Sequence, residues 1–182
     1  MDVLTINEIN HLLHYRVFLL FGSLFFLTRI ALGATAPVEV SSVDILSNGT
    51  RISATVYVPI ANDTKVKLPA IAMAHGWGGK AAHLSRYASE FSSAGFLVVA
   101  FDYRGWGRSD SRMVQTRSIE NGEYELVEYK GVVDPIDQAE DYIAVVNWLA
   151  THPKVDVENI GLWGTSWSGG TVVYVAARDS RI

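Results

Sequence analysis

Short apolar runs that alternate with helix-like spacing constrain the fold of this 182-residue chain more than any other feature. Residues 69–74 and 96–101 are almost entirely apolar, which is typical of strands covered on both faces in a parallel sheet. Between them, apolar residues recur at helical spacing from Leu84 to Ala94, and Gly95 follows as a stop signal. Upstream, residues 52–58 alternate apolar and polar, which predicts a half-buried strand after a turn.

The same alternation continues in the second half of the chain. Asp134 is a suitable N-cap before Pro135, so a helix is predicted from there to His152-Pro153. A short strand over residues 159–163 and a helix over 171–177 follow, separated by a Gly/Ser-rich turn. The pattern predicts an α/β fold, a mostly parallel sheet with helices on both faces.

The turn after strand 159–163 carries a serine between small residues. Ser166 has Gly164 two places before it and Ser168 two places after it, the spacing of a nucleophile elbow between a strand and a helix. Ser168 could be the centre instead, with Ser166 and Gly170 as its small neighbours. We prefer Ser166 because it lies closer to the end of the strand, although a plain Gly/Ser-rich turn is the simpler interpretation.

A glycine-rich loop, His75-Gly-Trp-Gly-Gly79, follows strand 69–74 where hydrolases with such an elbow supply an oxyanion donor. We expect the donors to be the backbone N–H groups of Trp77 and Trp167, and we expect His75 to brace the loop rather than act as a base. A phosphate-binding P-loop at Gly79-Lys80 is excluded, because the next residue lacks a hydroxyl. The residues expected to support the turns are His75, Gly76, Gly78, Gly164, Ser168 and Gly169.

A third motif spans Asp102 to Asp110 (DYRGWGRSD) after strand 96–101. Its two glycines lack the third glycine of a dinucleotide site. The two aspartates could form a catalytic acid pair, but we expect buried carboxylates that stabilise the turn.

Together and in this order, these motifs resemble the N-terminal half of an α/β-hydrolase. The segments concerned are AHGWGG (74–79), FDYRGWGRSD (101–110), the helix and strand over 134–164, and GTSWSGG (164–170). The resemblance is to the serine esterase and peptidase branch, with Xaa-Pro dipeptidyl-peptidase-like and dienelactone-hydrolase-like members. It implies Ser166 as the nucleophile, a histidine and an acid completing a triad, and neither cofactor nor metal. The implied substrate is a small-molecule ester or peptide.

The expected triad partners do not follow Ser166 in this sequence. In this fold the chain order is serine, acid, histidine, whereas all five histidines precede Ser166. We therefore expect a truncated chain in which the C-terminal half of the fold is absent and which is inactive alone. A genuine short form, a non-catalytic binding protein with this fold, is the alternative.

The connection from residue 111 to residue 133 is predicted as a long loop. It holds four glutamates, which could rim a substrate pocket and disfavour anionic substrates, or simply form a solvated acidic loop: Glu120, Glu123, Glu125 and Glu128.

The first 36 residues are set apart from the domain expected over residues 37–182. The apolar run 17–27 lies between two arginines and is too short alone to span a membrane, while small residues at 31–36 resemble a signal-peptide cleavage site. We expect residues 1–36 to be a signal peptide or an N-terminal membrane anchor, with membrane contact through residues 17–32 in the second case. The protein is then exported (periplasmic or secreted) or membrane-anchored.

Composition excludes several function classes. The net charge is −4, and no basic run is present, so we expect no nucleic-acid partner. The chain has no cysteine, which rules out disulfides, cysteine-bound zinc and a cysteine nucleophile. Composition leaves the oligomeric state open.

Overall fold

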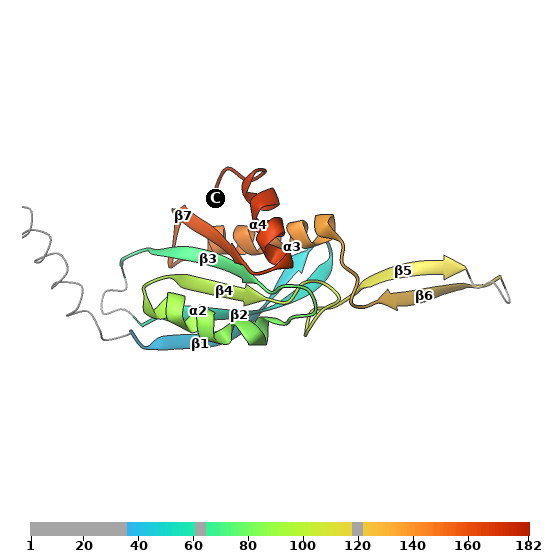
Figure 1. Ribbon diagram of the computed structural model, residues 1–182, viewed down its shortest axis with the longest axis horizontal. Coiled ribbons are helices and arrows are strands. Elements are labelled where there is room, and N and C mark those ends of the chain that lie inside the picture. The colour runs from blue at the N-terminus through green and yellow to red at the C-terminus, as the bar shows by residue number, and fades with distance from the viewer. Residues whose placement is uncertain (1–35, 61–64, 118–121) are drawn as a thin grey trace, which may run out of the picture. The chain divides into compact units, whose positions relative to one another are not determined.

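The computed structural model describes residues 36–60, 65–117 and 122–182. Its main sheet has five strands in the order β1-β2-β4-β3-β7 (Figure 1). The bounds of these strands are β1 Val38–Ser47, β2 Thr50–Pro59, β3 Leu68–Ala74, β4 Leu97–Phe101 and β7 Val155–Gly164. The helices are the 3-10 helix η1 Ala81–Leu84, then α2 Ser85–Ser93, α3 Pro135–Thr151 and α4 Trp167–Ala176.

The sheet is mixed, which corrects the prediction of a mostly parallel one. β3 pairs in parallel with β4 and with β7, whereas β2 pairs antiparallel with both β1 and β4. The physical reason is that a tight turn at Asn48 and Gly49, with φ angles of 48° and 82°, joins β1 and β2 as a hairpin, which makes this pair antiparallel. β1 was not predicted, because most of its residues are exposed and polar and apolar residues are mixed along it without a continuous apolar run.

Helices cover both faces of the sheet, as predicted. Alternate residues of β3 separate the two cores: Ala70, Ala72 and Ala74 face the core shared with α3 and α4. Ile71 and Met73 face the smaller core shared with η1 and α2. The runs 69–74 and 96–101 are continuously apolar because both of their faces are buried.

The helix ends follow the sequence signals closely. The Asp134 side chain caps α3 by accepting hydrogen bonds from the backbone N–H groups of residues 136 and 137. The predicted strands at 52–58, 69–74 and 96–101 are confirmed, and so is the helix that ends before Gly95. α4 begins at Trp167, four residues before the predicted start, because the turn that precedes it is much shorter than the Gly/Ser-rich stretch indicates.

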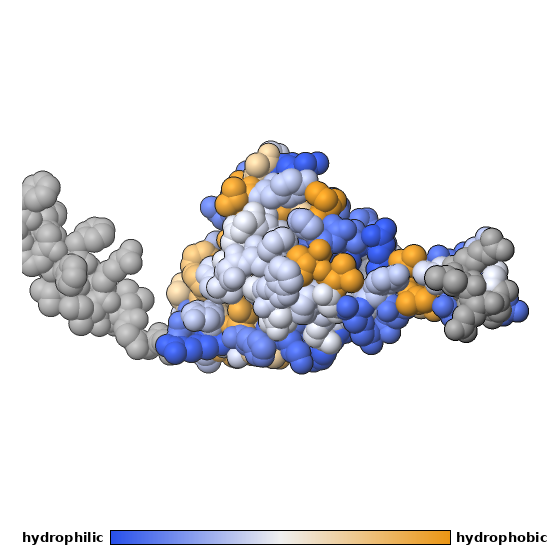
Figure 2. Space-filling view, turned by 45° about the vertical axis from the view of Figure 1, so that its right-hand side comes forward, coloured by the Kyte–Doolittle hydropathy of each residue, from blue (hydrophilic) through white to orange (hydrophobic). Residues whose placement is uncertain are grey.

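Residues 111–133 contain a β-hairpin rather than the predicted long loop. β5 (Arg112–Arg117) and β6 (Tyr124–Tyr129) form a separate two-stranded antiparallel sheet. Figure 1 shows this hairpin extending away from the main sheet. Met113 and Leu126 on it are 55% and 70% exposed, and one of the separate apolar patches in Figure 2 lies there. The hairpin was missed because its exposed faces mix charged and apolar residues.

The predicted signal peptide or anchor falls on residues that the structure does not describe, apart from Ala36. Across the described ranges, no helix combines the length and the apolar character needed to cross a membrane.

Candidate active site

Ser166 occupies a strained backbone position between β7 and α4. Its φ and ψ are 54° and −118°, and in the described part of the chain only Asn48 shares a positive φ among non-glycine residues. This region is costly for a residue with a Cβ, and such strain persists where the surroundings enforce it. The side chain is exposed just before the first turn of α4. The turn therefore presents a hydroxyl to solvent beside the positive end of a helix dipole.

Gly164 is small because strand and helix nearly touch at this turn. A Cβ at Gly164 would lie 2.6 Å from the carbonyl oxygen of Ser168, closer than real Cβ atoms approach. The spacing rule that singled out this motif thus has a direct steric cause. Gly169, another predicted supporting residue, lies in the first turn of α4 and donates its N–H to the carbonyl of Ser166.

Ser168, the alternative nucleophile, is fully buried. Its hydroxyl donates to the carbonyl oxygen of His75 at 2.6 Å and lies 2.5 Å from the hydroxyl of Tyr103. A serine enclosed in this way offers no access to a substrate. The geometry therefore favours Ser166 as the reactive serine of the pair.

The glycine-rich loop lies against Ser166. A Cβ at Gly76 would approach the Ser166 Cβ to 3.0 Å and its Oγ to 3.6 Å, so a side chain there would fill the space beside the hydroxyl. The N–H of Gly79 donates to the carbonyl of Gly76 and closes the loop as a tight turn that contains Gly78, whose φ is 70°. Segments 90 positions apart are thus brought together at the carboxyl ends of β3 and β7.

The two residues expected to supply oxyanion donors are neighbours. The rings of Trp77 and Trp167 meet edge to face with their centroids 5.9 Å apart. The Trp77 side chain is 69% exposed, and the Trp167 indole N–H donates to the side-chain oxygen of Gln138 at 2.6 Å. Gln138 was not singled out from the sequence, because a glutamine on a helix carries no pattern of its own.

His75 is buried beneath the loop. Its Nδ1 lies 2.8 Å from the carbonyl oxygen of Gly76, and its Nε2 lies 3.9 Å from a carboxylate oxygen of Asp102. Burial lowers the pKa of this imidazole, more strongly than the Gly76 carbonyl and the Asp102 carboxylate raise it. A neutral imidazole with this placement suits a loop brace better than a base for Ser166.

The two aspartates of the third motif separate in the structure. Asp102 is buried and accepts hydrogen bonds from the backbone N–H groups of Ala81 and Arg108, which confirms the turn-stabilising expectation for it. Asp110 instead lies at the surface and forms an ion pair with Arg51, so it is not a buried carboxylate. Because the two carboxylates bind different partners, they do not form the catalytic acid pair that the motif could have held.

A buried ion pair that sequence reasoning missed supports this motif. Arg104 contacts Asp141 through its guanidinium, at 2.6 and 3.0 Å, and through its backbone N–H at 3.0 Å. Asp141 is fully buried, and burial raises its pKa against the opposing effect of Arg104. The available signal was an acid within the apolar face of the 135–151 helix, where an unpaired charge is unfavourable.

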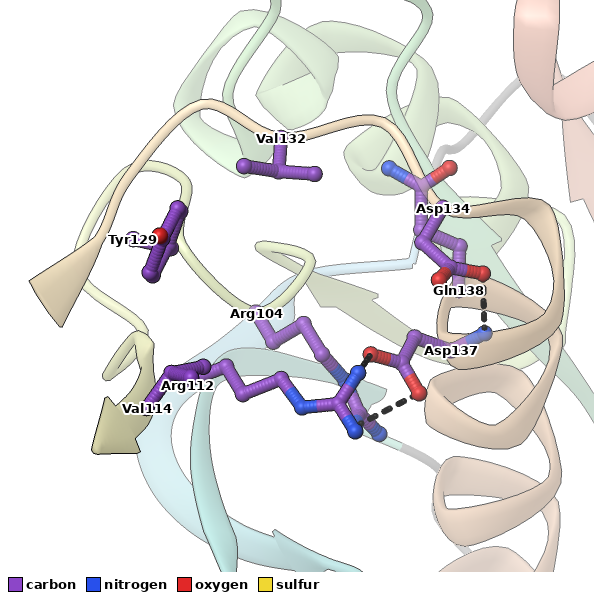
Figure 3. Close-up of a pocket in the computed structure, with 8 residues that line it drawn as sticks. All are labelled: Arg104, Arg112, Val114, Tyr129, Val132, Asp134, Asp137 and Gln138. Carbon is purple, nitrogen blue, oxygen red and sulfur yellow. Dashed lines mark hydrogen bonds and ion pairs between the residues drawn. The ribbon is translucent and has the colours of Figure 1, made fainter. Parts of the chain in front are cut away.

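A pocket of about 170 Å³ lies between the hairpin and the beginning of α3 (Figure 3). Asp137 joins its two arginines, with its carboxylate oxygens 3.3 Å from Arg104 and 3.2 Å from Arg112. The pocket adjoins the elbow indirectly, since Gln138 in its wall bonds Trp167. Three of its lining residues are apolar or aromatic and five are charged or polar: Arg104, Arg112, Val114, Tyr129, Val132, Asp134, Asp137 and Gln138.

No cluster of three or more His, Asp or Glu side chains suited to a metal ion is found in the part of the chain that the structure describes.

Comparison with known proteins identifies the family of this chain. The sequence profile of X-Pro dipeptidyl-peptidases (S15 family) matches residues 48–181. An uncharacterized 31.7 kDa protein of Escherichia coli, from the traX-finO intergenic region, is 39% identical over 75% of the chain and 41% of its own length. Thiohydrolase aneE of Aspergillus aculeatus is 33% identical over 78% of the chain and 39% of its own length.

The fold is also shared with solved structures. The crystal structure of hypothetical protein PA2218 from Pseudomonas aeruginosa superposes with a TM-score of 0.65 at 27% identity, over 83% of this chain and 42% of that one. The chain thus spans about two fifths of the length of these relatives. It belongs to the X-Pro dipeptidyl-peptidase (S15) family, and its sheet and helices match the N-terminal part of the α/β-hydrolase fold.

Proposed function

We propose that this chain supplies the nucleophile and the oxyanion hole of a serine hydrolase. The observation that carries the proposal is the strained, exposed Ser166 between β7 and α4, with Gly76 of the glycine-rich loop packed beside its hydroxyl. Strain of this kind is stored where function requires it. The match to the S15 family supports the same reaction class.

The reaction is acyl transfer to water. Ser166 Oγ attacks the carbonyl carbon of the substrate, and its proton passes to a histidine base. The carbonyl oxygen becomes an oxyanion held by the N–H groups of Trp77 and Trp167. The tetrahedral intermediate collapses as the C–O or C–N bond breaks, and the leaving group takes the proton. Water then attacks the acyl-enzyme with the same base, releasing the acid and restoring Ser166.

The base and its acid belong, in this proposal, to chain that follows Ser166 in a longer protein. The five histidines of the sequence all precede Ser166, and His75 is buried, with its Nδ1 bonded to the carbonyl oxygen of Gly76. Without a base, Ser166 stays protonated and reacts poorly. The 182-residue chain alone is therefore expected to show no ester hydrolysis above its Ser166→Ala variant.

The substrate is a small molecule with an ester or peptide bond. Because one relative is named a thiohydrolase, we include thioesters among the proposed substrates. A thioester carbonyl attacked by Ser166 would give the same kind of acyl-enzyme. We further propose that the protein is exported or membrane-anchored, on the strength of the apolar run 17–27 and the small residues that follow it.

The first experiment measures the mass of the native protein, with an antibody raised against residues 37–182. A species well above 20.0 kDa supports the proposal and is then treated with a fluorophosphonate probe, with Ser166→Ala as the control. Labelling that maps to Ser166 is the expected result. A native species of 20.0 kDa or slightly less, or a longer protein that does not label, would favour a non-catalytic binding protein with this fold.

A further inference from the structure

Two buried hydroxyl groups connect the elbow to the glycine-rich loop. The Ser168 hydroxyl donates to the carbonyl oxygen of His75, and the Tyr103 hydroxyl lies 2.5 Å from Ser168 Oγ. A serine hydroxyl has one proton and a carbonyl can only accept, so Tyr103 must be the donor in the second bond. Burial raises the pKa of Tyr103 to about 12, so this donor keeps its proton at neutral pH.

The loop segment held by this chain of bonds contains the expected oxyanion donor. The carbonyl oxygen of Gly76 lies 2.8 Å from His75 Nδ1 and accepts from the N–H of Gly79 at 3.0 Å. The N–H of Trp77 belongs to the same planar peptide unit as the Gly76 carbonyl. Fixing the direction of that carbonyl therefore fixes the direction of the Trp77 N–H.

The nucleophile-elbow spacing requires only a small residue at position 168, two places after Ser166, and a glycine there would meet that requirement. A glycine, however, has no hydroxyl to reach His75. Ser168 is fully buried and Tyr103 is 1% exposed, so their bonds do not compete with water. Both groups lie between β4, α4 and the loop, where they join three segments that are distant in sequence.

We propose that Ser168 and Tyr103 are positioning residues of the oxyanion hole. Their hydroxyls hold the His75–Trp77 segment against the elbow, so that the Trp77 N–H is set relative to Ser166 before a substrate binds. The inference rests on the proposed serine-hydrolase function for its catalytic meaning. The link between the elbow and the loop can be tested without any activity.

The first test is amide hydrogen exchange on the 182-residue chain. The Gly79 amide is the reporter, because its bond to Gly76 closes the loop. Losing one neutral hydrogen bond in Ser168→Ala should speed its exchange by about fivefold, while amides in β4 keep their wild-type rates. The matched control is Ser92→Ala, since the buried Ser92 hydroxyl has no hydrogen-bond partner among the described residues. Wild-type protection of Gly79 in Ser168→Ala would overturn the proposal.

A double variant distinguishes a linked pair from two separate structural effects. Tyr103→Phe alone should speed Gly79 exchange less than Ser168→Ala does, because the Ser168 bond to His75 remains. Adding Tyr103→Phe to Ser168→Ala should change the rate no further, since the shared link is already gone. Additive effects of the two substitutions would contradict the proposed link.

The second test follows fluorophosphonate labelling of Ser166 in the native protein. A misplaced oxyanion donor should lower the maximal labelling rate about tenfold in Ser168→Ala and leave the probe's binding constant unchanged. Wild-type labelling by Ser168→Ala would overturn the positioning role. If the wild-type protein does not label, the proposed function fails, and the exchange result by itself then decides whether the link exists.

Discussion

Replacing Ser166 by glycine should make the protein more stable, although it removes the proposed nucleophile. At φ 54° and ψ −118°, a residue with a Cβ carries backbone strain of about 1–3 kcal/mol, which glycine does not. Glycine also widens the unfolded ensemble, which costs roughly 0.5–1 kcal/mol. The Ser166 side chain is exposed, so its removal loses little burial. The net expectation is a gain of about 0.5–2 kcal/mol relative to Ser166→Ala, which keeps the strain.

Urea unfolding followed by far-ultraviolet circular dichroism measures this difference. With a slope of about 2 kcal/mol per molar urea, the midpoint of Ser166→Gly should lie roughly 0.3–1 M above that of Ser166→Ala. The matched control is Thr165→Gly at the preceding exposed residue, which lacks a positive φ and should lose roughly 0.5–1 kcal/mol. If Ser166→Gly loses stability as the control does, Ser166 is not strained and the basis of the active-site assignment is wrong.

Three further predictions concern stability. Gly164→Ala places a Cβ against backbone and should lower the free energy of unfolding by about 1–3 kcal/mol. Gly161→Ala, whose Cβ would have its nearest neighbour at 3.9 Å, should lower it much less, and equal urea midpoints for the two variants would contradict the steric account. Asp141→Ala breaks a buried ion pair and should lower the free energy of unfolding by about 3–5 kcal/mol. Asp110→Ala breaks an ion pair at the surface and should lower it by under about 1 kcal/mol, so similar thermal midpoints for the two variants would refute this prediction. Burial lowers the pKa of His75 in the folded protein, so as the pH falls the unfolded state binds a proton on His75 before the folded state does. The free energy of unfolding therefore falls as the pH drops below about 6.5. The loss between pH 7.5 and 5.5 should shrink in His75→Gln; an unchanged loss would place the titration elsewhere.

Local patterns predicted the parts of the fold that local forces determine. The continuous apolar runs marked β3 and β4 because both faces of these strands are buried, and Asp134 marked the start of α3 because its side chain caps that helix. β1 and the β5–β6 hairpin escaped notice, since exposed strands can carry charged residues in any order. The order and direction of the strands depend on long-range pairing, which no local pattern encodes.

In the candidate site, too, the features set by local sequence were predicted and those set by long-range packing were not. The small residues around Ser166 were readable because steric crowding restricts them, and Gly164 has that crowding in the structure. The hydroxyl link from Tyr103 through Ser168 to His75 was not readable, because it joins residues up to 93 positions apart. Likewise, the Arg104–Asp141 pair became visible only once the third motif and α3 were packed together.

The order of the sheet has a consequence for synthesis on the ribosome. β3 lies between β4 and β7, yet β7 is translated last of the three, so one side of β3 has no partner until the segment carrying Ser166 emerges. At about 5–20 residues per second, that interval lasts on the order of 5–20 s. During it, the nascent chain exposes an apolar strand to other nascent chains. Chaperone binding to this protein should therefore peak after β3 leaves the exit tunnel and decline once β7 has followed it.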